Sequence, residues 1–401
     1  MFNNLSLKVI LFGFIFTFFS SFGQSFFLGI FNSSIRNELL ITHGQFGTIY
    51  AGATLFSGFL LIWVGKKIDD INISKFAFFV ILLLSFSSFL FSNTTSTIFL
   101  FFSIFLMRFS GQGLMSHTAT TTISRYFTKS RGKALSVGWF GLSVAEFILP
   151  VFIIYLLTIT EWRNIWISIS ILIIVFLPTF SYFLIKKLNF ESREITKNEI
   201  FKKKEKQWKR IEVIKDFRFY IICANMLAMP WIATGIFIYQ SFITSSKNWG
   251  PYVIAQSFMV YSILSVITLF IAGFLIDKFT SRKLLIYMNI PLLFSVFIIY
   301  FFNHPISSFF FLGLIGISNG LANVLGSSTW TEIYGVKYIG SIKALTTALM
   351  VFSTAFGTAL FGILIDIGFS IEKISVVSGI YIAVSLIALF FIKDKLNPTI
   401  I

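Results

Sequence analysis

The sequence GKKIDDINISK at Gly65–Lys75 and the sequence GFLIDKFTSRK at Gly273–Lys283 occupy equivalent places in the two halves of the chain. Each copy follows an apolar run and has a Gly four residues before an Asp; the Gly, the Asp and the final Lys recur at an offset of 208 positions. A third landmark, Lys133-Ala134-Leu135, returns at Lys343 with an offset of 210. Several landmarks near one offset predict that the two halves are structural duplicates.

Twelve apolar runs accompany this repeat, six in each half. Each is near the ~20 residues that an α-helix needs to cross ~30 Å of hydrocarbon at ~1.5 Å per residue. The first run ends without a small-residue cleavage site, so we interpret it as a membrane helix and not as a signal peptide. The predicted spans are 9–31, 45–64, 76–92, 97–124, 134–157, 164–185, 219–243, 251–276, 284–302, 306–331, 342–365 and 374–392.

The composition excludes a water-soluble fold. Of 401 residues, 56% are hydrophobic and only 12% are charged, whereas soluble proteins have about 45–50% and about 25%. We therefore predict an all-α membrane protein with twelve transmembrane helices in two pseudo-symmetric six-helix bundles. The single cysteine, Cys223, permits neither an intrachain disulfide nor a thiol cluster. We expect no metal and no cofactor.

The distribution of positive charge predicts the orientation. With the amino terminus inside, the short loops and termini place fifteen Lys and Arg in the cytoplasm and four outside, as the positive-inside rule requires. We expect a plasma membrane protein, in the inner membrane of a bacterium, with both termini cytoplasmic. The net charge of +16 is assigned to loops facing anionic lipid, so membrane lipids are expected partners and nucleic acid is not.

We predict three parts along the chain: an amino-terminal six-helix bundle at 1–185, a basic cytoplasmic linker at 186–218 and a carboxy-terminal six-helix bundle at 219–401. The linker carries twelve Lys and Arg. It is interpreted either as a solvated connection or as a segment that contacts lipid or has a regulatory role.

The second loop copy matches the motif G-x-x-x-D-R/K-x-G-R/K-R/K of the major facilitator superfamily at Gly273, Asp277, Lys278 and Arg282, with Thr280 in place of the second Gly. The first copy departs further, having Asn72 where that Gly stands. The sequence RFSGQG also resembles the family's fourth helix, although its glycines are one residue off the usual spacing. The resemblance covers essentially the whole chain. It implies two six-helix bundles that work by alternating access.

The repeated loops are predicted to be gates. A Gly lets a helix end pack closely on its neighbour, and an Asp at a tight turn can pair with a basic residue. Such contacts would hold the two bundles closed on one side, while plain helix capping is the alternative. The predicted gating residues are Gly65, Asp69, Gly273, Asp277, Lys278 and Arg282.

Two ionisable residues fall clearly inside spans, Arg108 in the fourth and Glu146 in the fifth. Arg108 lies 17 positions before Arg125, and Glu146 lies 13 after Lys133, which places them ~25 Å and ~20 Å from the cytoplasmic ends of adjoining helices. A lone charge at that depth costs at least ~2.5–3.5 kcal/mol, so we expect mutual pairing or a wet cavity. Their predicted role is coupling or substrate binding; a static salt bridge is the alternative.

Further candidate substrate-binding or coupling residues are polar positions in other spans. Gln112 shares a helix face with Arg108, and Asn319, Asn323 and Trp330 form a polar stripe in the tenth span that could instead serve helix packing. Gln24 in the first span and Tyr239 and Gln240 near Pro230 in the seventh complete the set.

Paired six-helix halves predict transport through a site near mid-membrane. The expected function is secondary active transport of a small organic solute, with an organic anion favoured by Arg108 and protons as the candidate coupling ion. The loop RYFTKSRGKALS faintly resembles monocarboxylate and oxalate/formate carriers, whose usual Arg in the eighth helix is missing between 251 and 276. A proton-driven exporter of amphiphilic compounds is the alternative, followed by a non-transporting receptor. No enzyme motif is present, and a monomer is expected.

Overall fold

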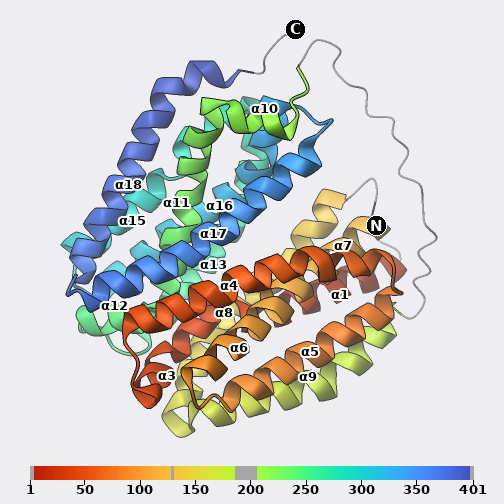
Figure 1. Ribbon diagram of the computed structural model, residues 1–401, viewed down its shortest axis with the longest axis vertical. Helices are drawn as coiled ribbons and strands as arrows, with labels where there is room; N and C mark the ends of the chain where they lie inside the picture. The colour runs from red at the N-terminus through yellow and green to blue at the C-terminus, as the bar shows by residue number, and fades with distance from the viewer. Residues whose placement is uncertain (1–3, 128–130, 186–205, 398–401) are drawn as a thin grey trace. The chain divides into compact units, whose positions relative to one another are not determined.

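The computed structural model describes residues 4–127, 131–185 and 206–397, and within these ranges the regular elements are helices. Twelve of the described helices are long and apolar enough to cross a membrane, which confirms the predicted fold class (Figure 1). Their bounds are Leu5–Gly23, His43–Asp69, Ile73–Ser92, Thr97–Tyr126, Gly132–Ile159, Trp162–Ile185, Phe217–Ile238, Val253–Phe279, Ser281–Phe301, Ile306–Tyr334, Ile339–Asp366 and Ile371–Leu396.

Several spans consist of more than one helical element. In the first half the elements are α1 (Asn4–Ser20), η1 (Ser21–Gly23), α2 (Ser25–Leu28), η2 (Gly29–Phe31), α3 (Asn32–Leu39), α4 (His43–Val64), η3 (Gly65–Asp69), α5 (Ile73–Ser92), α6 (Thr97–Met107), the π-helix η4 (Arg108–Met115), α7 (Ser116–Tyr126), α8 (Arg131–Ile159) and α9 (Trp162–Ile185). In the second they are α10 (Arg210–Lys215), α11 (Phe217–Ile238), α12 (Gln240–Ser246), α13 (Val253–Phe279), α14 (Ser281–Leu284), η5 (Leu285–Tyr287), α15 (Ile290–Phe301), α16 (Ile306–Tyr334), α17 (Ile339–Asp366), α18 (Ile371–Ile392) and η6 (Lys393–Leu396).

The chain divides into two compact units. The first contains Met1–Glu194 together with two short pieces of the second half, Phe237–Phe242 and Thr358–Ile363. The second contains Ile195–Ile236, Ile243–Gly357 and Leu364–Ile401. The predicted boundaries at 185 and 219 stay a prediction.

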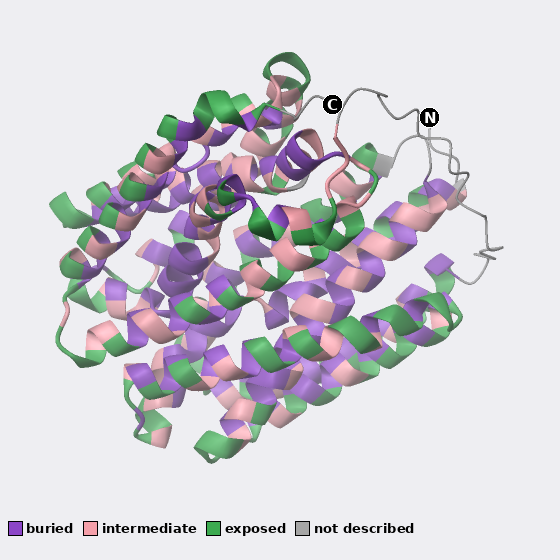
Figure 2. Cartoon of the chain, turned by 45° about the horizontal axis from the view of Figure 1, so that its top comes forward, coloured by how far each residue is buried: buried purple, intermediate pink, exposed green. Residues whose placement is uncertain are grey.

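Large apolar side chains cover the outer faces of the helices. Phe274, Val175 and Phe391 are 77%, 69% and 78% exposed, and Figure 2 shows exposed segments alternating with buried ones along the helices. A soluble protein rarely leaves so many large apolar groups in contact with water. These faces are therefore the surfaces that meet lipid.

The first unit is held together by close helix pairs, α1 with α8 and α5 with α9 (Figure 1). Thr17 Oγ1 donates a 2.6 Å hydrogen bond to the carbonyl oxygen of Gly138. Ser85 and Ser170 each donate from Oγ to the other's carbonyl oxygen, at 3.0 and 2.8 Å. Small residues that let backbones approach and hydroxyls that bond across the gap are the usual means of packing helices in lipid.

The second unit uses the same chemistry. Helix α13 packs on α16, and α15 packs on both α16 and α18. A Cβ on Gly316 would lie 2.3 Å from the carbonyl oxygen of Tyr261, so the backbones of α13 and α16 are in direct contact there. Asn289, between η5 and α15, donates a 2.6 Å bond to the carbonyl oxygen of Asn225 in α11. This amide therefore ties the interrupted ninth span to the seventh.

The end of the predicted linker is folded, while its residues 186–205 lie outside the described part of the chain. Arg218 and Asp216 form a buried ion pair at 2.8 Å, and Tyr334 Oη donates to Asp216 at 3.1 Å. The backbone N–H of Trp208 donates to the carbonyl oxygen of Tyr334 at 3.0 Å, and Val213 is completely buried. From 206 to 218 this segment is therefore a folded part of the second unit, with Val213, Asp216 and Arg218 buried.

The contact between α1 and α8 gives a stability prediction. A Cβ at Gly141 would lie 1.9 Å from the carbonyl oxygen of Phe14, so Gly141→Ala must push the two helices apart. We expect a loss of about 1–3 kcal/mol, seen as a lower midpoint of thermal unfolding in detergent. Gly340→Ala is the control, because nothing lies within 4 Å of the position of its Cβ. Equal midpoints for the two variants would contradict this close approach.

Candidate functional site

The first membrane span is interrupted in its second half. Helix α1 ends at Ser20, η1 covers Ser21–Gly23, and α2 begins at Ser25. Gln24 between them is extended, with φ −84° and ψ 153°. An extended residue cannot continue the helical ladder, so backbone groups around it need other partners. The predicted single helix over 9–31 is wrong at this point, because an apolar run does not report a local break.

The fourth span faces this interruption with a π-helix, η4, that starts at Arg108. A π-helix has i→i+5 hydrogen bonds and therefore wider turns than an α-helix, so it can accommodate an inserted residue. This agrees with the glycines of RFSGQG, which are one residue off the family's usual spacing. A Cβ on Gly23 would lie 2.3 Å from the carbonyl oxygen of Met107, and one on Gly111 would lie 2.7 Å from the amide nitrogen of Gly23. The absence of side chains at Gly23 and Gly111 therefore lets the two irregular segments touch.

Arg108 bridges the interruption. Its Nη1 donates to the carbonyl oxygen of Gly23 at 3.1 Å and to Ser25 Oγ at 3.2 Å. Ser25 Oγ lies 3.0 Å from Tyr50 Oη, and the guanidinium carbon is 5.3 Å from the Tyr50 ring centroid. The side chain is only 1% exposed, and its Nε has no partner in the part of the chain that the structure describes. The site is therefore a buried cation held by neutral oxygens and an aromatic ring.

Glu146 lies in a neighbouring helix and forms no ion pair with Arg108. It is 8% exposed and lies in α8, which packs on α1 and contacts η1. The described residues form five ion pairs, and neither Arg108 nor Glu146 takes part in any of them. The predicted pairing of these two residues is thus wrong for this structure, because the guanidinium is directed to the break in the first span. Their functional roles stay predictions.

Two other predicted residues belong to this site. Gln24 is the extended residue at the break, and Gln112 lies in the π-helix, where its backbone nitrogen would be 2.6 Å from a Cβ on Gly23. Both side chains are half-buried. The structure therefore brings Gln24, Arg108 and Gln112 together around one backbone interruption.

Tyr239 and Gln240 lie where the seventh span ends, in a piece that belongs to the first compact unit. Tyr239 Oη is 2.9 Å from the carbonyl oxygen of His43 and 3.0 Å from that of Thr358. Gln240 Nε2 donates at 2.9 Å to the carbonyl oxygens of Phe26 and Phe237. Both side chains are buried and their donors are used on backbone oxygens.

The predicted polar stripe of the tenth span is divided between three environments. Asn319 Nδ2 donates to Ser265 Oγ at 3.0 Å, so it joins α16 to α13. Asn323 is exposed. Trp330 is 2% exposed and lies in an apolar cluster with Phe219 and Tyr334. The stripe is therefore not a continuous polar wall, and Trp330 packs in a core.

The two repeated loops are fixed by different chemistry. In the first, Asp69 pairs with Arg125 of α7, whose Nη1 also donates to the carbonyl oxygen of Ile68 at 3.1 Å. His117 Nε2 donates to the carbonyl oxygen of Gly65 at 3.0 Å. These bonds tie the end of the second span to the fourth, so Gly65 and Asp69 are anchored inside the first unit.

In the second loop, the carboxylate of Glu332 accepts from the backbone N–H groups of Ser281 and Arg282, at 2.8 and 3.2 Å. Asp277 is exposed, and no described residue, Lys278 included, pairs with it. Nothing lies within 4 Å of a Cβ on Gly273, so its predicted close packing is not observed. Glu332 was not among the predicted residues; it lies 207 positions after Arg125, close to the repeat offset of 208, but it is an acid where the first half has a base.

Thr280 shows why the family motif has glycine at its position. Its φ is 71° and its ψ is 148°, a region that is essentially restricted to glycine and costs other residues about 1–3 kcal/mol. Its hydroxyl is buried without a described partner. Asn72, at the equivalent position of the first copy, has φ −55° and caps Ser74 through its Oδ1 at 2.9 Å.

Thr280→Gly is therefore expected to stabilise the protein. Relief of the backbone strain should outweigh the extra freedom of glycine in the unfolded chain and raise the free energy of unfolding by about 1 kcal/mol. Asn72→Gly is the matched control and should lower it, because it removes a cap at an ordinary φ. The readout is the thermal unfolding midpoint of the purified protein. A Thr280→Gly midpoint at or below that of the wild type would refute the strain.

The family profile described as Major Facilitator Superfamily matches residues 13–358. A bacterial homologue of the human lysosomal transporter Spinster, in an inward-facing and unoccupied conformation, superposes with a TM-score of 0.75 and 12% identity over 100% of both chains. The nucleoside transporter NupG superposes with a TM-score of 0.70 and 13% identity over 98% of this chain and 99% of that one. No curated protein matches the sequence.

Proposed function

Because the chain belongs to the major facilitator superfamily, we propose that it is a secondary transporter that moves a small organic anion of carboxylate type across the membrane by alternating access. Membrane transport follows from the family, and the anion, the proton coupling and the residues involved are the proposal. The nucleoside transporter among its structural neighbours does not guide the choice of solute, since 13% identity shows the fold alone.

The observation that supports an anion is the uncompensated charge of Arg108. A guanidinium stays protonated under all physiological conditions, and burial in the membrane without a carboxylate costs at least ~2.5–3.5 kcal/mol. No carboxylate of the described residues pairs with Arg108. A bound organic anion would supply the missing charge and accept from the unused Nε–H, with the planar fork of donors matching a carboxylate.

The backbone break supplies the means of coupling binding to movement. A carboxylate that takes the donors of Arg108 competes with the carbonyl oxygen of Gly23 and with Ser25 Oγ, the two groups that fix the first span to the fourth. Broken helices that carry binding groups and change partners are a common device in secondary transporters. Gln24 and Gln112 lie at the same interruption and would hydrogen-bond the solute.

Glu146 is the candidate proton carrier. It is buried and takes part in none of the ion pairs found among the described residues. A carboxyl group can accept and release a proton whereas Arg108 cannot. Glu146 also favours the second candidate function, a proton-driven exporter of amphiphilic compounds. Such an exporter needs a group that carries the proton, and it does not require a cation such as Arg108 to bind its solute.

The first test is transport by the purified protein in liposomes under an imposed pH gradient. Labelled monocarboxylates and dicarboxylates are expected to accumulate or to leave, while nucleosides and cationic dyes are not. Protein-free liposomes are the control. Movement of the dyes alone would replace this proposal by the exporter, and movement of no solute would favour a receptor that has kept the fold.

The second test separates the roles of the buried charges. Arg108→Gln should lower carboxylate transport at least tenfold, while Arg108→Lys, which keeps the charge, should retain part of it. Glu146→Gln should still bind the anion but lose most of the dependence on the pH gradient. Since the two residues are not paired, the charge-free double variant should be as inactive as Arg108→Gln. Full transport in the double variant would reduce both charges to a structural role, provided that its expression and thermal midpoint match those of the singles.

A further inference from the structure

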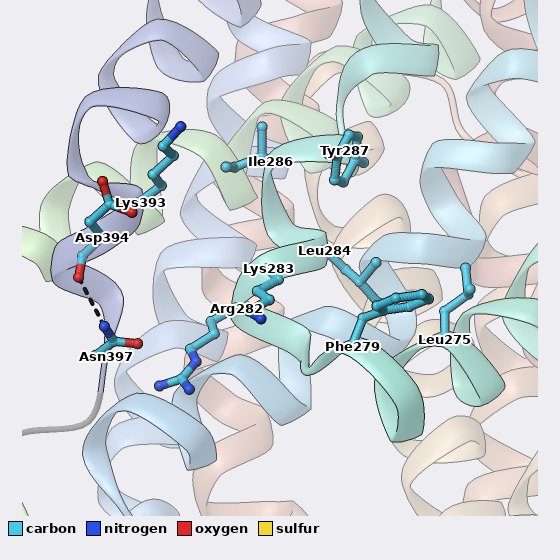
Figure 3. Close-up of a pocket in the computed structure, with 10 residues that line it drawn as sticks. All are labelled: Leu275, Phe279, Arg282, Lys283, Leu284, Ile286, Tyr287, Lys393, Asp394 and Asn397. Carbon is cyan, nitrogen blue, oxygen red and sulfur yellow. Dashed lines mark hydrogen bonds between the residues drawn. The ribbon is translucent and has the colours of Figure 1, made fainter.

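A cavity of about 600 Å³ opens in the second unit, far along the chain from the Arg108 site. It lies between the α13–α14 connection and η6, where the spans Val253–Phe279, Ser281–Phe301 and Ile371–Leu396 begin or end. Its level is therefore that of the interface between hydrocarbon and water, on the side for which the charge pattern predicts the cytoplasm. Figure 3 shows η6 facing the α13–α14 connection across this cavity.

The lining combines positive charge with apolar surface. Arg282, Lys283 and Lys393 contribute three cations, and Asp394 is the one carboxylate among the lining residues. The apolar part includes Phe279 and Tyr287 (Figure 3). A net positive pocket with aromatic walls at the interface suits a ligand that is anionic at one end and apolar at the other.

Arg282 gives the second, independent observation. Its Nε and Nη1 are buried and have no hydrogen-bond partner within the described structure. The carboxylate of Glu332 accepts from the backbone N–H groups of Ser281 and Arg282, and it forms none of the ion pairs found among the described residues. Buried donors of a charged group are rarely left unused. Their state indicates a site for an anion with several acceptor oxygens.

We propose that this cavity binds the phosphate group of an anionic phospholipid. A phosphate accepts two parallel bonds from a guanidinium and further bonds from lysine ammonium groups. The acyl chains would leave the pocket along the apolar residues Leu275, Phe279 and Tyr287. A soluble phosphate ester offers the same head chemistry but makes no use of these walls.

The repeat offers a matched control. Lys283 corresponds to Lys75 in the first half, and Arg282 corresponds to Ser74, so the guanidinium of this site has no counterpart in the first loop. There the basic residue Arg125 already pairs with Asp69. Lys75 is exposed in the first turn of α5. Lys75→Gln therefore removes one surface charge of the same kind without touching the cavity.

The test is native mass spectrometry of the full-length, delipidated protein, titrated separately with phosphatidylglycerol, phosphatidylcholine and glycerol phosphate. One phosphatidylglycerol should bind in preference to phosphatidylcholine. The double variant Arg282→Gln, Lys393→Gln should weaken this binding about tenfold or more, as expected for lost charge-assisted hydrogen bonds. Lys75→Gln should leave it unchanged. Glycerol phosphate should bind much more weakly than the lipid.

Three results would overturn the proposal: equal binding of the two lipids, equal loss in Lys75→Gln and in the double variant, or glycerol phosphate binding as tightly as phosphatidylglycerol with the same dependence on Arg282. The last would assign the cavity to a soluble phosphate ester. If the double variant is not monodisperse in gel filtration, Lys393→Gln alone decides. Lys393 is exposed, so its substitution spares folding and should still weaken lipid binding severalfold.

Discussion

The hydrogen bond from Arg108 to the carbonyl oxygen of Gly23 is the interaction on which the break in the first span, and with it the candidate site, depends. Lipid offers no partner to a backbone group, so a membrane helix can be broken only where protein replaces the lost bonds. Arg108 supplies that replacement from the π-helix of the fourth span, and Gly23 and Gly111 leave room for the contact. The same charge would be costly without this use, and the anion that we propose as the solute would have to displace the carbonyl oxygen of Gly23 from it.

The apolar runs and the repeat predicted the twelve spans and the duplicated halves, because hydrophobic length and charge between spans are properties that a sequence displays directly. The break at Gln24 was not predictable in this way, since Phe residues surround it on both sides. The similar depth of Arg108 and Glu146 in the membrane was also not enough to predict whether they form an ion pair. Two residues at one level meet only if their helices are turned toward each other, and the sequence alone does not specify that rotation.

The repeated loops at 65–75 and 273–283 have the same spacing of Gly, Asp and Lys, but they are held by different contacts. Asp69 is bound by a cation of the fourth span, whereas the loop at Ser281 is bound through its amides by Glu332 of the tenth. A carboxylate can bind backbone amides whatever side chains the loop carries. The guanidinium of Arg282 is therefore not needed to fix the loop, and Arg282 lines the cavity. Thr280 keeps the glycine conformation of the motif without the glycine. A motif match therefore located these loops correctly but did not give their bonding partners.

Hydrogen–deuterium exchange of the backbone amides at 21–28 tests the central claim most directly. In the wild-type protein these amides should be protected, and a transported carboxylate should speed their exchange by drawing Arg108 away from the carbonyl oxygen of Gly23. In Arg108→Gln they should exchange several times faster from the start and should not respond to the anion. Unchanged protection in the variant, together with no response to the anion in the wild type, would contradict the account.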